Sequence, residues 1–200
     1  LRNLDLERND RQYLTEQLEA DASFAVCDVS GRLFMAHLAK KGDRAVQLEK
    51  ARRAGDTMAV RLNSMKRSEA QLISLQDDAE LTLALAEGFT LGSYAFRKYK
   101  SDEKGAPSLE KLSIVAKEAS TKDIEELTDL CEAVCAARDL VNEPVSFLNA
   151  KQLASEIRDL GKAAGFKVQI MDKGRIEAQG MGGLLAVNKG SLDEPAFCIL

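Results

Sequence analysis

The organisation of this chain is decided by the stretch Ala137-Arg138-Asp139-Leu140-Val141-Asn142-Glu143-Pro144. The stretch ends a long segment in which apolar residues recur at intervals of three, four and seven, the spacing of an amphipathic helix. The apolar positions are Ile124, Leu127, Leu130, Cys131, Val134, Ala137 and Val141. Pro144 lacks a donor N–H and disfavours helix at the preceding residue, so the helix is predicted to end near Val141 or Asn142.

The start of this helix has a signal of its own. Ser120 followed by Asp123 resembles a capping box, the arrangement that begins many helices. A helix of this length spans roughly 30 Å, enough to connect two compact units. We therefore predict an N-terminal α/β domain over residues 1–120, a linker helix over 121–143 and the beginning of a second domain over 144–200.

The first 120 residues alternate between strand-like and helix-like patterns. Helices are predicted within residues 1–20, over 43–66 and from Asp77 and Asp78 to about Tyr99. Strands are predicted over 23–29 and 32–38, which form a hairpin around Ser30-Gly31, and over 70–75 and 112–116. This alternation predicts a layered α/β domain with a largely parallel or mixed sheet. Gly88 and Gly92 are expected to allow a close approach between helix and sheet.

Residues 144–200 continue the α/β pattern. A helix is predicted from Asn149, with Gln152 in capping-box position and Gly165 as C-terminal cap. A strand over 166–171, a short helix over 173–179 and a strand over 195–200 follow. The sheet begun here is unfinished, and its last strand has an apolar edge, so we expect the chain to be a piece of something longer or to be completed by another chain.

The glycines of residues 180–183 do not form a phosphate-binding motif. Neither GxGxxG nor GxxxxGK[ST] is present, and the glycines precede a strand-like run rather than a helix. A tight turn is the favoured interpretation.

Composition excludes several classes of protein. The chain is 45% hydrophobic and 30% charged with a net charge of −4, so a nucleic-acid surface is not indicated. No run approaches the roughly 18 apolar residues of a membrane span, and no secretory leader is visible. We therefore expect a cytoplasmic protein whose four cysteines are reduced.

Few residues are candidates for chemistry. His37, the only histidine, is predicted to lie mid-strand on the face of Leu33 and Met35, and a structural role is favoured because no oriented partner is readable. Cys131 and Cys135 lie one helical turn apart, but two thiolates are half a zinc site, so packing is favoured over metal binding. No HExxH, GxSxG or Cys/His motif is present. No catalytic or metal-binding residue is assigned within residues 1–200, and substrate-binding residues stay unknown.

Three segments carry a resemblance to a known family. They are residues 87–96 (EGFTLGSYAF), 136–144 (AARDLVNEP) and 181–191 (MGGLLAVNKGS). Their order and spacing resemble the leucyl aminopeptidase (cytosol aminopeptidase) family, in which the second segment joins the two domains. The resemblance covers Glu87 to about Leu200, whereas the preceding residues match only in pattern.

The resemblance implies a macro-domain-like N-terminal module and a dimetal peptidase that removes N-terminal residues, Leu favoured, from peptides. Two divalent metal ions, Mn or Zn, activate a water and polarise the scissile carbonyl in such enzymes. The family's metal ligands and catalytic arginine lie beyond the turn at 181–191, hence past Leu200, so no bound metal is expected on residues 1–200. The resemblance also implies a homo-oligomer, a hexamer for the intact protein, to whose assembly the N-terminal domain contributes.

Two alternatives stay open at this point. The first 120 residues could form a macro-like module that binds a nucleotide or ADP-ribose, a reading supported by fold analogy alone. They could also form an assembly module without peptidase activity.

Overall fold

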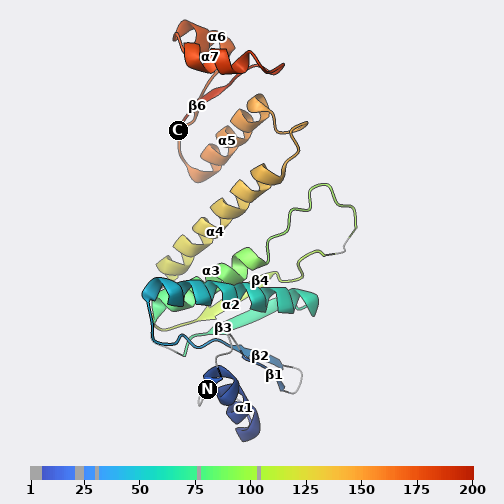
Figure 1. Ribbon diagram of the computed structural model, residues 1–200, viewed down its shortest axis with the longest axis vertical. Coiled ribbons are helices and arrows are strands. Elements are labelled where there is room, and N and C mark those ends of the chain that lie inside the picture. Colours follow the sequence, from blue (N-terminus) through green and yellow to red (C-terminus); the bar gives the residue numbers. More distant parts are fainter. Residues whose placement is uncertain (1–5, 21–24, 30–31, 76–77, 103–104) are drawn as a thin grey trace. The chain divides into compact units, whose positions relative to one another are not determined.

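The structure is a computed structural model that describes residues 6–20, 25–29, 32–75, 78–102 and 105–200 (Figure 1). The chain divides into two compact units, Leu1–Cys135 and Ala136–Leu200. The boundary between them falls inside helix α4 (Thr121–Asn142), whose bounds agree closely with the predicted linker helix. The finer division into residues 1–120, 121–143 and 144–200 stays a prediction.

The first unit contains the predicted alternation of helices and strands. Its elements before α4 are α1 (Arg8–Glu19), β1 (Ala25–Val29), β2 (Arg32–Ala36), α2 (Arg44–Ser64), β3 (Glu69–Ile73), α3 (Ala79–Gly92) and β4 (Lys111–Val115). Strands β1 and β2 form the predicted antiparallel hairpin, and β3 and β4 pair in parallel from Glu69 opposite Lys111 to Ile73 opposite Val115. Residues 23, 24, 30 and 31 of the predicted hairpin lie outside the described residues. The α/β fold class is confirmed, but among the described residues β1–β2 and β3–β4 form two separate two-stranded sheets, not the single largely parallel or mixed sheet that was predicted.

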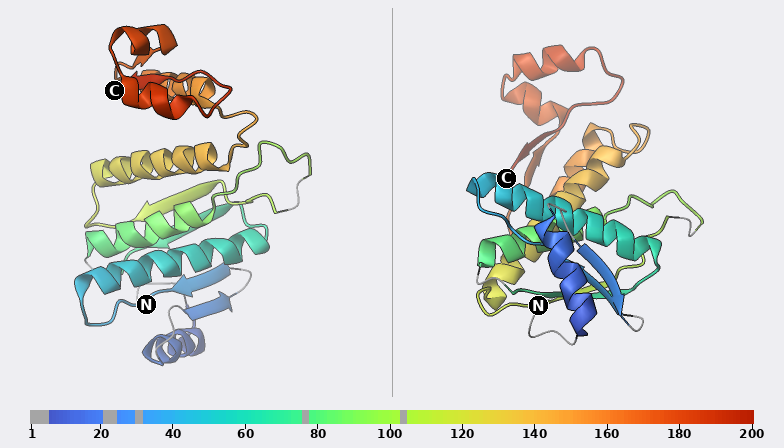
Figure 2. Two further views of the ribbon diagram at one scale, coloured as in Figure 1. Left: turned by 45° about the horizontal axis from the view of Figure 1, so that its top comes forward. Right: turned by 60° about the horizontal axis from the view of Figure 1, so that its bottom comes forward.

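The core of this unit lies between the helix pair α2–α3 and the strands β3 and β4. Met58, Ala59 and Leu62 of α2 are buried with Phe89 of α3. The inward-facing strand residues Ala70 and Leu112 pack against this cluster, as the two-residue period of a strand requires. Figure 2 shows α2 and α3 side by side.

The predicted close approach at glycine exists, but it joins two helices rather than a helix and the sheet. A Cβ atom placed on Gly88 would lie 2.6 Å from Arg52 Cα, and one placed on Gly92 would lie 2.8 Å from Asp56 Cα. Both contacts are with the backbone of α2. The glycines of α3 therefore set how closely α2 and α3 pack.

Helix α3 ends at Gly92, so the prediction that it continues to about Tyr99 is wrong. The Ser93 hydroxyl donates to the Phe89 carbonyl at 3.2 Å and accepts from the Asn63 side chain at 3.4 Å. The bond from Asn63 ties Ser93 to α2, and the chain leaves α3 there as a long loop. The loop runs out from α3 before it returns to β4 (Figure 1).

The second unit contains the end of α4, two short strands and three more helices. These elements are α5 (Ala150–Ala164), β5 (Gln169–Met171), α6 (Lys173–Ala178), α7 (Gly182–Asn188) and β6 (Phe197–Ile199). Strands β5 and β6 are antiparallel, with Met171 opposite Phe197. The Asn149 side chain caps α5 by accepting from Gln152 N at 3.0 Å, and Gly165 ends it with a φ of 82°, as predicted.

The run after the glycines of residues 180–183 is a helix, so its prediction as strand-like is wrong. The turn itself exists, because Gly180 has a φ of 66°. Leu184, Leu185 and Ala186 all favour helix, and the run is too short for its apolar pattern to separate a buried strand from a helix. Leu185 N donates to Met181 O at 3.2 Å and begins the helical hydrogen bonding.

Large apolar side chains remain exposed in the second unit. Val141, Val145 and Val187 are each more than 80% exposed, and Leu192 is fully exposed. Among the described residues, no helix is long and apolar enough to span a lipid bilayer.

Candidate functional site

The carboxyl ends of β3 and β4 are the place where an α/β unit most often binds a ligand. Ser74 directly follows β3, and its N–H donates to Val115 O at the end of β4 at 3.0 Å. The Ser74 hydroxyl also donates to the Glu118 carboxylate. Thr82, a buried residue of α3, places its hydroxyl 2.9 Å from Ser74 Oγ and 3.1 Å from Glu118 Oε1. This polar cluster joins α3 to the segments that directly follow β3 and β4.

An arginine–carboxylate cluster lies at the start of α3. Asp78 caps the helix by accepting from Leu81 N at 3.1 Å. Its two carboxylate oxygens also accept from Arg44 at 2.8 and 2.7 Å, and Glu80 accepts from the same guanidinium at 2.6 Å. The Arg44 guanidinium holds the pKa of Asp78 below its ordinary value, and the two carboxylates raise the pKa of Arg44.

The carboxylates of these two clusters disfavour the binding of an anionic ligand. The N-terminal end of a helix attracts negative charge, but at α3 this role is taken by Asp78 and Glu80. A diphosphate at the carboxyl ends of β3 and β4 would also meet the carboxylate of Glu118, whose pKa is lowered by the hydrogen bond from Ser74. The arrangement is that of a structural ion-pair network, and it does not favour the nucleotide-binding alternative.

With Asp78→Asn, the free energy of unfolding should fall less steeply as the pH is lowered. The pKa of Asp78 is lower in the folded chain than the roughly 3.9 of an unfolded aspartate, so the unfolded state binds more protons below about pH 4. The carboxylate thus stabilises the fold above that pH, and the stabilisation is lost as the pH falls through the folded pKa. Asparagine still caps the helix but does not titrate.

The measurement is the free energy of unfolding by urea from about pH 6 to about pH 3. The wild-type chain should lose stability more steeply than Asp78→Asn in the acidic part of the range. Asp129→Asn, on the exposed face of α4, is the matched control and should keep the wild-type slope. Equal slopes for the wild type and Asp78→Asn would contradict the expectation.

The sequence-predicted candidates lie apart from these clusters. His37 is half-buried and directly follows β2, which ends at Ala36, so it is not the mid-strand residue that we predicted. The side chain of Leu33, with which it was predicted to share a face, lies outside the described side chains. Gly180 forms a turn on the surface of the second unit, with open space around it.

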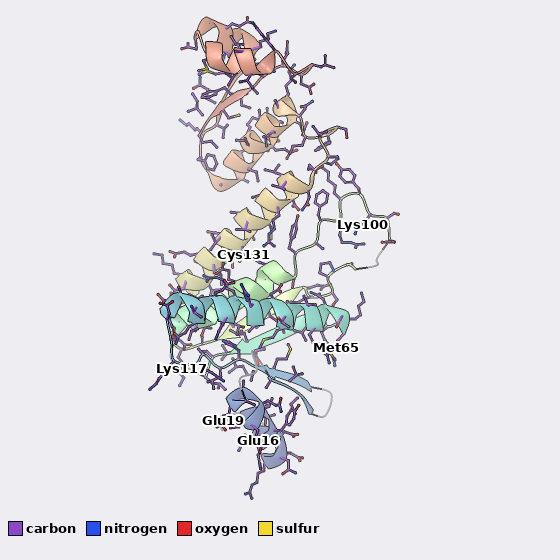
Figure 3. The ribbon with its side chains drawn as sticks, in the orientation of Figure 1. Glu16, Glu19, Met65, Lys100, Lys117 and Cys131 are labelled. Atoms are coloured by element: carbon purple, nitrogen blue, oxygen red, sulfur yellow. The ribbon has the colours of Figure 1, made fainter. Side chains whose placement is uncertain are left out.

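The four cysteines lie in different surroundings. Cys131 is buried on the inner side of α4, as predicted, whereas Cys135 is half-buried (Figure 3). Cys27 donates to Asp10 Oδ1 at a sulfur–oxygen distance of 3.6 Å. Within the described part of the chain, no three side chains of His, Cys, Asp or Glu come together as a set that could hold a metal ion.

Sequence reasoning missed the role of Asn63. Its side chain accepts from Ser108 N at 2.7 Å and from Leu109 N at 3.0 Å, and it donates to Ser93 Oγ. Asn63 therefore ties together the two ends of the loop between α3 and β4. An asparagine near the end of a helix gives no local signal for such a contact, because its partners are 30 and 45 residues away.

Comparison with known proteins places the second unit in a peptidase class. Residues 135–200 match the family model for the cytosol aminopeptidase family, catalytic domain. The match begins inside α4, close to the boundary between the two units.

Curated relatives extend the similarity to most of the chain. A probable cytosol aminopeptidase of Clostridium perfringens is 36% identical over 168 residues, which cover 76% of this chain and 33% of that protein. A probable cytosol aminopeptidase of Chlorobaculum tepidum is 40% identical over 146 residues, covering 64% of this chain and 28% of that protein. The chain spans about a third of the length of these relatives.

Solved structures share the fold. The bottromycin maturation enzyme BotP superposes with a TM-score of 0.77 and 24% sequence identity. The match covers 98% of this chain and 43% of the BotP chain. A tomato leucine aminopeptidase mutant superposes with a TM-score of 0.70 and 22% sequence identity. This match covers 88% of this chain and 37% of the tomato chain. At these identities the likeness concerns the fold alone.

Together these findings define the chain as an α/β unit followed by part of an aminopeptidase catalytic domain. The chain belongs to the cytosol aminopeptidase family, of whose members it represents a part. The resemblance based on residues 87–96, 136–144 and 181–191 is thereby confirmed.

Proposed function

We propose that the intact protein is a metal-dependent aminopeptidase that removes N-terminal residues, Leu among the favoured ones, from peptides. Residues 1–200 would be its front portion and would serve assembly and scaffolding rather than chemistry. The match of residues 135–200 to the family's catalytic domain is the observation that carries the proposal.

The metal chemistry is assigned to the rest of the protein. Two divalent ions, Mn or Zn, would activate a water and polarise the scissile carbonyl. One structure with the same fold is described as a complex with Mn. The described part of residues 1–200 does not offer three suitable ligands in one place, so we derive no catalytic step from its residues.

Membership of the family also supports a cytoplasmic location and a homo-oligomeric assembly. The curated relatives are named cytosol aminopeptidases, which supports a cytoplasmic protein. A homo-oligomer, a hexamer for the intact protein, agrees with the assembly role proposed for the first unit.

Residues 1–200 should not hydrolyse a leucyl amide, even with added Mn²⁺ or Zn²⁺. The complete reading frame, expressed and assayed in the same way, should be active and should lose activity on chelation. Both proteins should be assayed at equal molar concentration after the same purification, so that a contaminating host peptidase is recognised. Turnover proportional to the amount of the 1–200 chain would contradict the proposal that residues 1–200 serve scaffolding and not catalysis. Absence of activity from the complete protein over a range of peptides and metals would contradict the proposed function itself.

A further inference from the structure

The two polar clusters described above are joined through Thr82. Its hydroxyl lies 3.0 Å from the carbonyl oxygen of Asp78, the residue that pairs with Arg44, and 3.1 Å from Oε1 of Glu118. The Ser74 hydroxyl donates to the same carboxylate. These five residues therefore form one network, which we call the polar latch, that links the starts of α2 and α3 to the segment after β4.

Glu118 lies in the short connection between β4 and the linker helix α4. Residues 116–120 belong to neither a helix nor a strand, and α4 begins at Thr121. Glu118 is half-buried in the middle of this connection. Hydrogen bonds to a carboxylate are stronger than those between neutral groups. The hydroxyls of Ser74 and Thr82 thus hold the connection to the end of β3 and to α3.

Helix α4 is capped by residues of its own. The Asp123 carboxylate accepts from Ser120 N at 2.8 Å, and Asp123 N donates to Ser120 Oγ at 3.2 Å. This capping box satisfies the start of the helix without any group of the polar latch. The first turn of α4 can therefore stay helical when Glu118 is released, and the movement would take place in the connection before Ser120.

The packing of α4 on the first unit can be followed at Cys131. The part of the helix up to Cys135 belongs to this unit, and Cys131 is 3% exposed (Figure 3). A side chain buried to this degree is covered by residues of other elements, because an isolated helix leaves its side chains exposed. The Cys131 thiol should therefore react when α4 moves away from these residues, since reaction requires access.

We propose that the polar latch holds the start of α4 on the first unit, and that releasing Glu118 lets α4 separate from this unit while α2, α3, β3 and β4 stay folded. The latch would thereby control the freedom of the helix in which the two units meet. Local openings of this kind need less free energy than the unfolding of a whole unit. The inference goes beyond the proposed peptidase function and does not depend on it.

Site-resolved labelling of the native thiols tests the latch. The 1–200 chain is treated with iodoacetamide, and mass spectrometry follows Cys131 and also Cys27, a half-buried thiol of β1. Glu118→Ala should raise the labelling rate of Cys131 about tenfold or more and leave Cys27 near its wild-type rate. Ser74→Ala should act in the same direction. Combined with Glu118→Ala it should add little, because both substitutions remove the same contact.

Glu125→Ala is the matched control for the labelling experiment. It removes the same charge from an exposed position on α4 and should leave both labelling rates unchanged. Urea unfolding of each variant, followed by circular dichroism, separates local opening from a general loss of stability. Equal acceleration at Cys27 and Cys131, in step with lower global stability, would overturn the latch, because the network would then stabilise the whole unit. Unchanged labelling of Cys131 in Glu118→Ala would also overturn it, because other contacts would hold α4.

Discussion

Gly88→Ala should cost the first unit about 3 kcal/mol or more of its free energy of unfolding. The methyl group of the new residue would lie 2.5 Å from the carbonyl carbon of Arg52 and 2.6 Å from its Cα. Both atoms belong to the backbone of α2, so no change of rotamer relieves the overlap. Helices α2 and α3 would have to move apart, and the core cluster of Met58 and Phe89 between them would lose its packing.

Gly55 and Gly42 supply the comparisons. A Cβ atom on Gly55 would lie 2.7 Å from Phe89 N, so Gly55→Ala should destabilise the same contact from the side of α2. Gly42 has open space around it and no left-handed φ, so Gly42→Ala should change stability by no more than about 0.5 kcal/mol. Urea unfolding followed by circular dichroism measures all three variants. A Gly88→Ala chain as stable as Gly42→Ala would show that α2 and α3 do not pack as described.

Asn63→Ala should cost about 2 kcal/mol and release the loop between α3 and β4. Alanine leaves the half-buried N–H groups of Ser108 and Leu109 without the oxygen that both now share. Trypsin should then cleave after Arg97, Lys98 or Lys100 about tenfold faster, because cleavage follows the local opening of a segment. The measurements are urea unfolding and the rate of limited proteolysis.

Asn63→Asp is the control variant for this contact. Aspartate keeps an oxygen in the position of Oδ1 and loses only the weaker bond to Ser93, which is 3.4 Å long. It should therefore retain most of the stability and the resistance to trypsin. Equal proteolysis of the wild type and Asn63→Ala would show that other contacts hold the loop.

The limits of sequence reasoning are clearest at the two ends of α3. Its start was predicted from Asp77 and Asp78, because carboxylates suit the positive end of a helix dipole and precede a helical pattern. The structure shows Asp78 as the capping residue. Its end was predicted too late, because the run from Ser93 to Tyr99 has no proline and contains residues that a helix accepts. The helix stops where Asn63, 30 residues earlier, holds Ser93.

The polar cluster of Ser74, Thr82 and Glu118 was likewise not predictable. Its members are separated by up to 44 residues and form no motif. They meet only because β3 and β4 pair in parallel, which brings the ends of both strands to one edge.

Four features could be predicted from the sequence: the α/β alternation, the extent of α4, the caps at Asn149 and Gly165, and the family. The elements and caps depend on the period of apolar residues and on residues that begin or end a helix locally. The family was recognised from three short segments in a fixed order. The three-dimensional structure was needed to show that Gly88 faces a helix, that residues 182–188 are helical, and that Asn63 closes the loop. The contacts of Gly88 and Asn63 join segments far apart in the chain, and a local sequence pattern does not indicate which segments will meet. Residues 182–188 form an apolar run too short for its pattern to separate a strand from a helix.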